Sequence, residues 1–253
     1  MDKLDGAAIV LPGVEVRVVE RCTSTNDLLL EETHTVLLAA EEQTAGRGRR
    51  GRRWHSAPEA GLTFSLGRRI RRPARELAAL SLVAGVAAAR ALRALGVRRA
   101  ALKWPNDLLV DGAKLGGILV EARTPASSRG GSYAVVGVGI NCRRTPGLAA
   151  RLGREVAFVN DFVAVSRNEI LQLTGAALLA TLDAFEAGGL EALRAEWEAM
   201  DAHAGQRLRV RLADGRVVSG VAGGLAEDGA LRLVTRSGVR AVRSGRVVSA
   251  RAQ

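Results

Sequence analysis

The order of apolar and polar residues predicts an N-terminal part in which strands and helices are mixed. Short apolar or alternating segments favour strands at 14–19, 36–40, 62–66, 101–103, 108–110, 114–122 and 133–140. Longer alanine- and leucine-rich segments favour helices at 73–95, 166–187 and 190–200. Because these strands and helices do not alternate as regular βαβ units, the pattern favours the α+β fold class.

Two helix starts are marked by particular residue types. The polar residues at 24–27 supply N-cap candidates for a helix that includes the leucines at 28–30. Ser166 is followed three residues later by Glu169, which is the spacing of a capping box. We therefore expect helices to begin at both places.

The pattern changes near residue 204, where short strands replace the longer helices. Strand-like segments occur at 207–212, 216–222, 230–234, 239–242 and 246–248. They are separated by turn signals at Asp214-Gly215, Asp228-Gly229 and Ser237-Gly238. The sequence therefore predicts a larger domain at 1–203, long enough for a catalytic domain, and a small β-barrel of SH3-like size at 204–253.

A hairpin that contains a lysine is the first candidate for chemistry. Lys114 is one of only three lysines among 37 basic residues, and a lysine kept in such a background indicates a need for a compact ammonium. Asp111-Gly112 predicts a two-residue turn in which Asp107 pairs with Gly116. One face of the hairpin would then carry a cation and a carboxylate beside an open glycine floor, which suits an anionic substrate.

The glycine- and arginine-rich segment at 43–54 is the second candidate. Gly46, Gly48 and Gly51 are interleaved with five arginines, and the absence of any periodicity predicts a loop. A nucleotide phosphate or an acyl-adenylate would order such a loop through bidentate contacts. Nucleic-acid tracts share this composition but usually interleave aromatic residues, and only Trp54 lies nearby. The loop alone leaves both interpretations open.

The other reactive residues exclude several classes of site. The segment at 135–142 lacks the third glycine and the helix start of a dinucleotide fingerprint. The three histidines have no nucleophile context, and Cys22 and Cys142 match no metal-ligand or redox spacing. Acidic residues occupy the place of a leader, and the apolar run at 78–89 is too short to span a bilayer. A reducing cytoplasm is the simplest setting, and the net charge of +11 alone decides nothing about partners.

Several motifs, taken in their order along the chain, resemble those of the biotin protein ligases (biotin–[acetyl-CoA-carboxylase] ligases). The matching segments are Ser-Thr-Asn at 24–26, Gln-Thr-Ala-Gly-Arg-Gly-Arg-Arg-Gly-Arg at 43–52, Trp54, Lys-Trp-Pro-Asn-Asp at 103–107, Lys-Leu-Gly-Gly-Ile-Leu-Val-Glu at 114–121 and Gly-Val-Gly-Ile-Asn at 137–141. The resemblance extends through 194–201 into the barrel and covers essentially the whole chain. It implies the biotin–lipoate ligase fold, a mixed sheet with helices as in class II aminoacyl-tRNA synthetases, with an SH3-like C-terminal domain.

The resemblance also implies a reaction and its partners. Biotin and ATP would form biotinoyl-5′-AMP and pyrophosphate, with Mg²⁺ on the phosphates, and biotin would then pass to one lysine of a biotin carboxyl carrier domain. Larger family members carry an N-terminal helix-turn-helix domain, whereas here the ligase motifs start almost at once. We therefore expect a cytoplasmic enzyme with no repressor function, no specific DNA site and no membrane association, and the resemblance leaves a monomer and a homodimer both open.

The motif matches assign a role to each site residue. Hydrogen bonds to the biotin head and walls around it are implied for Ser24, Thr25, Asn26, Gln43, Gly46, Gly116 and Gly117. The carboxylate and the adenylate phosphate would face Arg47, Arg49 and Lys114, with Arg49 closing the loop over the intermediate. Asp107 would orient or help to deprotonate the target lysine. The nucleotide side would include Arg50, Trp54, Asn106, Asn141 and Arg243, with Asn106 on phosphate or metal and Trp54 near the adenine or the biotin tail.

Two other functions compete with this interpretation. A lipoate ligase or octanoyltransferase would use the same fold, but the sequences at 46–51 and 103–107 favour biotin. A basic nucleic-acid-binding module would use the barrel and the arginine loop, and its affinity would depend steeply on salt. That second function leaves the Lys114 hairpin unexplained.

Overall fold

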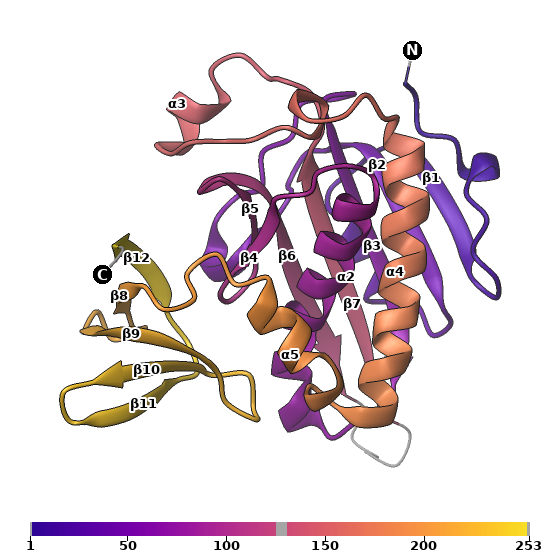
Figure 1. Cartoon of the computed structure of the whole chain (residues 1–253). Helices are drawn as coiled ribbons and strands as arrows, with labels where there is room; N and C mark the ends of the chain where they lie inside the picture. Colours follow the sequence, from indigo (N-terminus) through magenta and orange to yellow (C-terminus); the bar gives the residue numbers. More distant parts are fainter. Residues whose placement is uncertain (1, 125–130, 252–253) are drawn as a thin grey trace.

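A seven-stranded sheet and a five-stranded sheet organise the chain (Figure 1). The computed structural model describes residues 2–124 and 131–251. The strands of the larger sheet are β1 (Glu15–Cys22), β2 (Val36–Gln43), β3 (Gly61–Ile70), β4 (Ala100–Lys103), β5 (Asp107–Val110), β6 (Ala113–Arg123) and β7 (Ser132–Asn141). Their order is β1-β2-β3-β7-β6-β5-β4, in which β1 and β2 are parallel and the other neighbours are antiparallel. The α+β class with a mixed sheet is confirmed.

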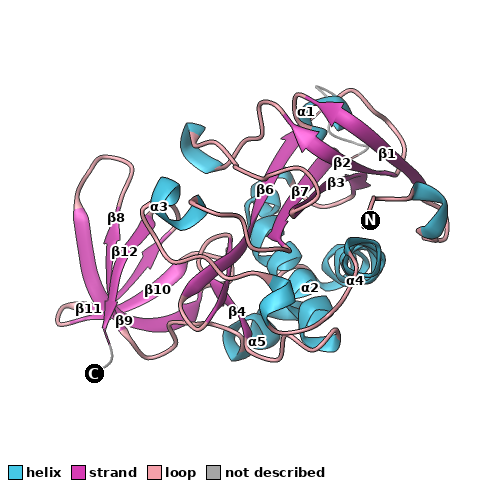
Figure 2. Cartoon of the chain, turned by 90° about the horizontal axis from the view of Figure 1, so that it is seen from above, coloured by secondary structure: helices cyan, strands magenta, loops and turns pink. Residues whose placement is uncertain are grey.

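Two long helices cover one face of this sheet. α2 (Leu80–Ala94) and α4 (Arg167–Gly188) pack against each other, and α5 (Glu191–Ala199) packs beside them. α2 buries eleven of its fifteen residues, most of them alanine, leucine or valine, so it lies inside the core. Figure 2 shows α2 and α4 on one side of the sheet and the short α1 (Thr25–Leu29) on the other.

Helix boundaries follow the predicted signals in most places. The capping box of α4 is present, because the Ser166 hydroxyl accepts from the Glu169 amide and Glu169 accepts from the Ser166 amide. The helix predicted at 73–95 begins instead with a 3-10 segment, Ala74–Ala79, before α2. Ser24 stands at the N-cap of α1 without a side-chain capping bond. A further short helix, α3 (Leu148–Leu152), was not predicted.

The smaller sheet contains the five predicted C-terminal strands. They are β8 (Arg207–Arg211), β9 (Val217–Leu225), β10 (Leu231–Thr235), β11 (Gly238–Val242) and β12 (Arg246–Arg251). All neighbours are antiparallel, in the order β11-β10-β9-β8-β12. Gly215, Gly229 and Gly238 have positive φ angles at the predicted turns.

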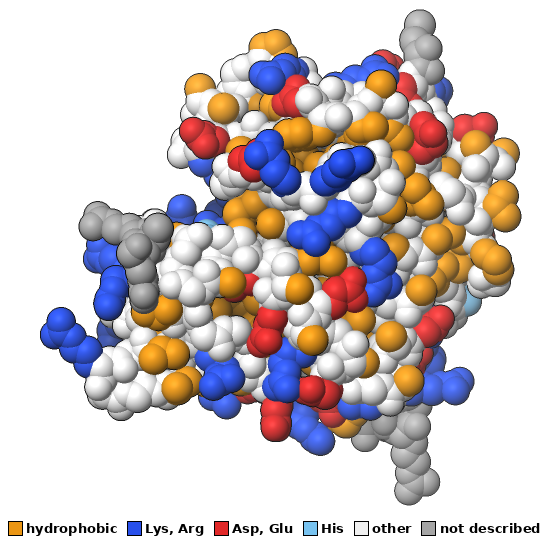
Figure 3. Space-filling view, viewed as in Figure 1, with side chains coloured by type: hydrophobic (Ala, Val, Ile, Leu, Met, Phe, Trp, Pro, Cys, Tyr) orange, Lys and Arg blue, Asp and Glu red, His pale blue; other side chains and the backbone are white. Residues whose placement is uncertain are grey.

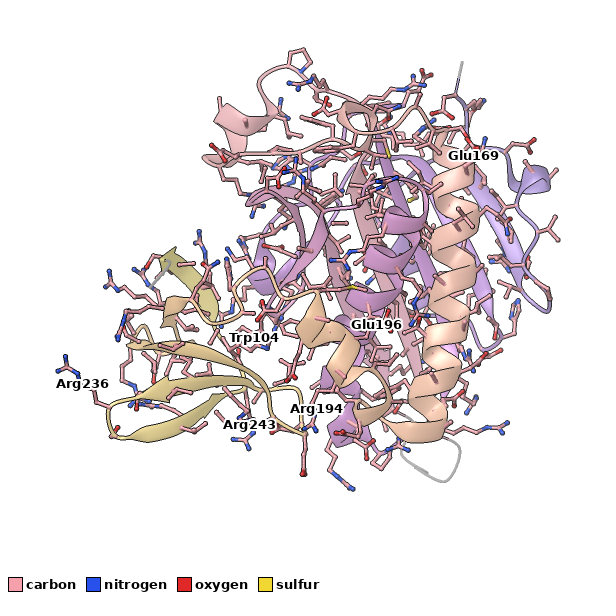
Figure 4. The ribbon with its side chains drawn as sticks, in the orientation of Figure 1. Trp104, Glu169, Arg194, Glu196, Arg236 and Arg243 are labelled. Carbon is pink, nitrogen blue, oxygen red and sulfur yellow. The ribbon has the colours of Figure 1, made fainter. Side chains whose placement is uncertain are left out.

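The two sheets are joined by a short connection and a buried contact. Residues around Asp201 extend alongside β4, because the Leu102 amide donates to Met200 and the Ala202 amide donates to Leu102. The Trp104 indole Nε1 donates to the Gly229 carbonyl at 3.1 Å, and Trp104 lies at the junction in Figure 4. One continuous hydrophobic cluster includes buried residues from both parts.

Two helical segments have the length and hydropathy of membrane spans. They are Ala74–Ala94 and Arg167–Gly188, and 72% and 44% of their most apolar windows are buried inside the protein. Both belong to the layer that covers the sheet. Core helices with buried faces on several sides commonly reach such hydropathy, so this finding alone does not indicate a membrane protein.

Candidate functional site

A cavity of about 480 Å³ lies beside α1, and residues of β2, β3, β6 and β7 also line it. Its floor includes Gly117 on β6 and Gly137 and Gly139 on β7. A Cβ atom at Gly137 would overlap the Asn26 amide, and one at Gly139 would overlap the Trp54 indole. The glycines therefore let side chains from α1 and the arginine loop approach the sheet closely.

The hairpin register differs from the predicted one by one residue. Leu109 pairs with Lys114, but Asp107 pairs with Gly117, so the predicted Asp107–Gly116 pair is wrong. Leu115 is the extra residue of a β-bulge, and its side chain is fully buried. Gly116 consequently does not line the cavity, since a Cβ there would meet the Gly139 carbonyl and Leu108.

Lys114 and Asp107 still meet across the bulge. Lys114 is 9% exposed, and its Nζ donates to Asp107 Oδ1. Arg154 Nη1 lies 3.8 Å from the other oxygen of Asp107, and the Trp54 ring centroid lies 5.7 Å from the ammonium. Burial lowers the pKa of Lys114 from its ordinary value, although the Asp107 carboxylate opposes that change. A partly desolvated ammonium here would interact strongly with an anionic group.

Polar side chains from α1, β2 and β3 form the end of the cavity near α1. The Thr25 amide donates to Gln43 Oε1 at 2.8 Å, and the Thr25 hydroxyl lies 2.7 Å from the Ser65 hydroxyl. Ser65 donates to Asn26 Oδ1 at 2.6 Å. These groups are buried or half-buried and offer donors and acceptors at fixed positions, as recognition of a polar ligand head requires.

The same hydrogen-bond network continues to the arginine loop. Asn26 Nδ2 donates to Glu121 Oε2 at 2.9 Å, and Arg47 Nη2 donates to the same oxygen at 2.7 Å. Arg47 also binds Asp27. The guanidinium of Arg47 is therefore held by two carboxylates, and the network connects it to Thr25 and Gln43.

The arginine loop folds back on itself above the cavity. Arg47 and Arg53 form an isolated bridge, and the Trp54 amide donates to the Gly46 carbonyl at 2.9 Å. Residues Arg49–Gly51 form a 3-10 turn in which Arg50 has a φ of 60°. Burial lowers the pKa of Arg49, and Arg49 lines the cavity. The Trp54 indole Nε1 is buried without a hydrogen-bond partner.

The structure brings most predicted site residues to this one cavity. Those lining it are Ser24, Thr25, Asn26, Gln43, Arg47, Arg49, Trp54, Asn106, Asp107, Lys114 and Gly117. The predicted residues that do not line it are Gly46, Arg50, Gly116, Asn141 and Arg243. Asn106 is tied to β6, because its Nδ2 donates to the Ile118 carbonyl at 2.7 Å.

Three of the predicted nucleotide-side residues have other contacts. Asn141 is buried and donates to the carbonyls of Lys114 at 3.1 Å and Ala157 at 3.4 Å, which fixes the backbone beside Lys114. Arg243 is exposed and pairs with Asp228 at 2.7 Å. Arg50 donates to the Ser244 hydroxyl at 3.2 Å.

Sequence reasoning missed several residues that line the cavity. Arg154 follows α3 and Arg246 begins β12, whereas Arg52 belongs to the arginine loop that was already a candidate. Thr63 and Phe64 come from β3. Arginine is so frequent in this chain that no local pattern separated Arg154 and Arg246 from surface arginines. Among residues 2–124 and 131–251, no group of three or more His, Cys, Asp or Glu side chains is arranged to hold a metal ion.

Comparisons with known protein families divide the chain as the fold does. Residues 18–141 match the model of the biotin/lipoate A/B protein ligase family. Residues 203–248 match the biotin protein ligase C-terminal domain. The first match contains the cavity floor and the arginine loop, and the second covers most of the smaller sheet.

The chain is similar in sequence to curated biotin ligases and in structure to solved biotin protein ligases. The bifunctional ligase/repressor BirA of Escherichia coli is 32% identical, with 92% of this chain and 71% of that protein covered. The biotin–[acetyl-CoA-carboxylase] ligase of Mycobacterium tuberculosis is 33% identical, with coverages of 94% and 90%. A structure of the Aquifex aeolicus biotin protein ligase in complex with biotin and ATP is 26% identical, with a TM-score of 0.78 and coverages of 94% and 99%.

Proposed function

The chain belongs to the biotin protein ligase family and is a biotin ligase, and we propose that it acts in two steps. In the first, biotin and ATP form biotinoyl-5′-AMP and pyrophosphate. In the second, biotin passes to a lysine of a biotin carboxyl carrier domain and AMP is released. The observation that carries this proposal is the convergence of Lys114, Asp107 and the arginine loop on one glycine-floored cavity.

The first step requires two anions to react with each other. An oxygen of the biotin carboxylate attacks the α-phosphorus, and the bond from that phosphorus to the β-phosphate bridging oxygen breaks. Lys114 and Arg49 line the cavity where these charges meet, and a partly desolvated site increases their effect. Thr25 and Gln43 would hold the polar biotin head, so that the carboxylate points towards Lys114.

The second step transfers the biotinoyl group to nitrogen. The ε-amine of the carrier lysine attacks the carbonyl carbon of the mixed anhydride, and the carbon–oxygen bond to AMP breaks. Asp107 is a carboxylate at the cavity wall that two cations already hold in place. It would orient the incoming amine by accepting a hydrogen bond from it.

Mg²⁺ would enter this site with ATP. The described residues supply no cluster of three acidic, histidine or cysteine side chains, although Asn106 and Asp107 place oxygen atoms at the cavity wall. That donor set fits an ion held mainly by phosphate oxygens and water, which is common for Mg²⁺.

Pyrophosphate release with Mg-ATP tests the reaction most directly, with biotin, with lipoate and with neither. We expect a burst of about one equivalent with biotin alone, followed by turnover when a biotin carrier domain is added. Pyrophosphate release with lipoate alone would instead identify lipoate as the substrate and favour the lipoate ligase function. Folded protein that releases no pyrophosphate with either acid would refute the proposed function.

We propose that the chain acts only as an enzyme and not as a repressor, and sequence-specific binding to DNA would contradict this proposal. Basic and acidic side chains are interspersed on the face shown in Figure 3, which differs from a continuous basic strip for a nucleic-acid backbone. We expect no sequence-specific footprint on DNA at physiological salt. The cytoplasmic setting and a homodimer remain predictions, and sedimentation with and without biotin and ATP tests the latter.

A further inference from the structure

A chain of hydrogen bonds runs behind the polar end of the cavity, from Glu121 on β6 to Thr25 on α1. Asn26 and Ser65 are its middle members, and their exposed fractions are only 3% and 0%. Thr25 and Asn26 line the cavity, whereas Ser65 on β3 does not. Ser65 can therefore affect a ligand only through these two neighbours.

The first link of the chain fixes the orientation of the Asn26 amide. One terminal atom of this side chain lies 2.9 Å from Glu121 Oε2 and 3.3 Å from the Leu119 carbonyl oxygen. Because a carboxylate and a carbonyl oxygen only accept hydrogen bonds, this atom must be the nitrogen. The other terminal atom is consequently Oδ1, which faces Ser65 and can only accept.

The orientation of Asn26 decides where the two hydroxyl protons of the chain lie. Ser65 Oγ lies 2.6 Å from Asn26 Oδ1, so the single proton of Ser65 points to Asn26. Thr25 Oγ1 lies 2.7 Å from Ser65 Oγ and 3.1 Å from Gln43 Oε1. The Gln43 atom accepts from the Thr25 amide at 2.8 Å and is therefore an oxygen. Both neighbours of the Thr25 hydroxyl need its proton, and none is left for the cavity.

This end of the cavity consequently has a fixed hydrogen-bonding polarity. The Thr25 hydroxyl presents a lone pair to a ligand. Gln43 has the opposite character, because its Nε2 carries two protons and donates to no group within residues 2–124 and 131–251. An acceptor beside a donor matches a ring in which an N–H group is bonded to a carbonyl group, as in the cyclic urea of biotin. The dithiolane ring of lipoate has neither group.

We propose that Ser65 is a positioning residue that holds Thr25 as a hydrogen-bond acceptor, so that the cavity selects acids whose ring carries an N–H group. This inference rests on the proposed function and identifies what sets its choice of substrate. A ring N–H gains a hydrogen bond at Thr25. A ring oxygen at the same place brings two lone pairs together and leaves both without a proton, and a buried mismatch of this kind costs more than a missing contact.

Competition binding with biotin and two cyclic carbamate analogues of biotin tests the polarity of the unsubstituted protein. In each analogue a ring oxygen replaces one of the two ureido N–H groups. We expect one analogue to bind about 100-fold or more weakly than biotin, because a site built for an N–H donor rejects a ligand that lacks it. Equal affinities for biotin and both analogues would overturn the inference.

Ser65→Ala tests the positioning role itself. The proton of Thr25 then loses its acceptor at 2.7 Å and can turn towards a ring oxygen, since the contact with Gln43 is longer and that oxygen already has a donor. We expect the ratio of the affinities for biotin and for the rejected analogue to fall about tenfold, the effect of one hydrogen bond. General loosening of the pocket would weaken the binding of both compounds and leave the ratio unchanged.

Ser132→Ala is the matched control in the same sheet. Ser132 begins β7, is 1% exposed and does not line the cavity, and its hydroxyl lies 2.8 Å from the Thr124 hydroxyl. The control removes the same group from a similar pair of hydroxyls, and it should keep the ratio of the unsubstituted protein. Equal ratios in Ser65→Ala and Ser132→Ala would reject the role of Ser65.

Ser65→Cys is the second variant, for the case that Ser65→Ala does not fold. Its thiol fills a similar volume but forms only weak hydrogen bonds, so the ratio should fall here too, and an unchanged ratio would reject the role of Ser65.

Failure of the proposed function gives a different result from failure of this inference. If the unsubstituted protein binds biotin but releases no pyrophosphate with Mg-ATP, the two-step reaction is rejected, and the affinity ratios still decide the role of Ser65. If it binds none of the three compounds, both the proposed function and the inference are rejected.

Discussion

Lys114 occupies a pocket that leaves little space around its ammonium. Its side chain is 11% exposed and is enclosed by Asp107 and the Trp54 ring. A Cβ atom added at Gly117 would lie 3.1 Å from Nζ, so the glycine floor and the lysine fit closely together. The rarity of lysine in this chain predicts a compact ammonium here, and the close fit between Gly117 and Nζ gives a steric reason for it.

We predict that Lys114→Arg lowers the rate of biotinoyl-5′-AMP formation by about 100-fold or more. A guanidinium is larger than an ammonium and would displace Asp107 or Trp54, and a charge moved from a preorganised site stabilises the transition state less. Biotin-dependent exchange between ATP and pyrophosphate measures this step. Lys3→Arg, an exposed change of the same kind, is the control, and comparable rates for both variants would contradict the role of Lys114.

Asp201 and His203 form a second pair of half-buried titratable groups, at the connection to the barrel. Burial raises the pKa of Asp201 to about 6, and burial together with the Lys103 charge lowers the pKa of His203 to about 4. Asp201 therefore contributes stability at low pH that is lost as the pH rises from 3.8 to about 6. His203 contributes stability above pH 6.5 that is lost as the pH falls towards 4. The two effects oppose each other over nearly the same window.

We predict that Asp201→Asn makes the protein more stable at pH 7 and exposes the dependence on His203. The amide oxygen can still accept from the His203 amide, which Asp201 Oδ1 does at 3.0 Å, while the charge is gone. The melting temperature of this variant should increase as the pH is raised from 4 to 6.5, and that of the unsubstituted protein should change less over the same range. Parallel curves for the two proteins would contradict the opposed titrations.

The arginine loop and α1 are connected as elements through Glu121 on β6. This carboxylate receives hydrogen bonds from Asn26 of α1 and Arg47 of the loop. Its removal would loosen the loop and, through Asn26 and Ser65, the polar end of the cavity. Local opening of a loop needs little free energy when few contacts hold it, so the effect should appear in the loop first.

We predict that Glu121→Gln increases amide hydrogen exchange at 46–53 and raises the KM for biotin several-fold. The neutral amide loses the charge-assisted bond to Arg47, while its oxygen can still accept from Asn26. Hydrogen exchange by mass spectrometry and steady-state kinetics measure the two effects. Glu42→Gln, which removes the partner of Arg21 outside the cavity, should change neither quantity. If Glu121→Gln leaves the KM for biotin unchanged, the arginine loop is not coupled to the polar end of the cavity.

Local patterns predicted the elements well, but contacts between distant segments were beyond their reach. The turn at Asp111-Gly112 predicted the pairing near the tip of the hairpin correctly. The bulge at Leu115 could not be predicted, because it places Leu115 in a core formed by residues outside the hairpin. The pocket lysine was found because lysine is rare here, and Arg154 and Arg246 were missed because arginine is common. The fully buried Arg167 binds Glu41 and Asp2, which are 126 and 165 residues away along the chain.

At the scale of the whole molecule, the two sheets share one hydrophobic core. Leu208, Leu231 and Leu233 of the barrel belong to the same cluster as Leu82 and Trp197 of the larger part. The boundary at residue 203 stays a prediction, and the apolar contacts continue across it. A continuous core favours cooperative unfolding, because opening one part exposes apolar surface of the other.

We predict that a change far from the barrel lowers the stability of both parts equally. Tyr133→Phe removes the hydroxyl that donates to the His34 carbonyl at 2.8 Å, near the start of β7, and costs about 1 kcal/mol. Trp104→Phe removes the junction bond to Gly229 and costs about as much or more, because Gly229 is buried and its carbonyl loses its partner. The slowest-exchanging amides of β7 and of β8–β10 report the two parts separately. If the barrel unfolds with the rest, each variant lowers the protection of amides against hydrogen exchange by the same amount in both sets of strands. Barrel amides whose protection is unaffected by Tyr133→Phe would show that the barrel unfolds independently.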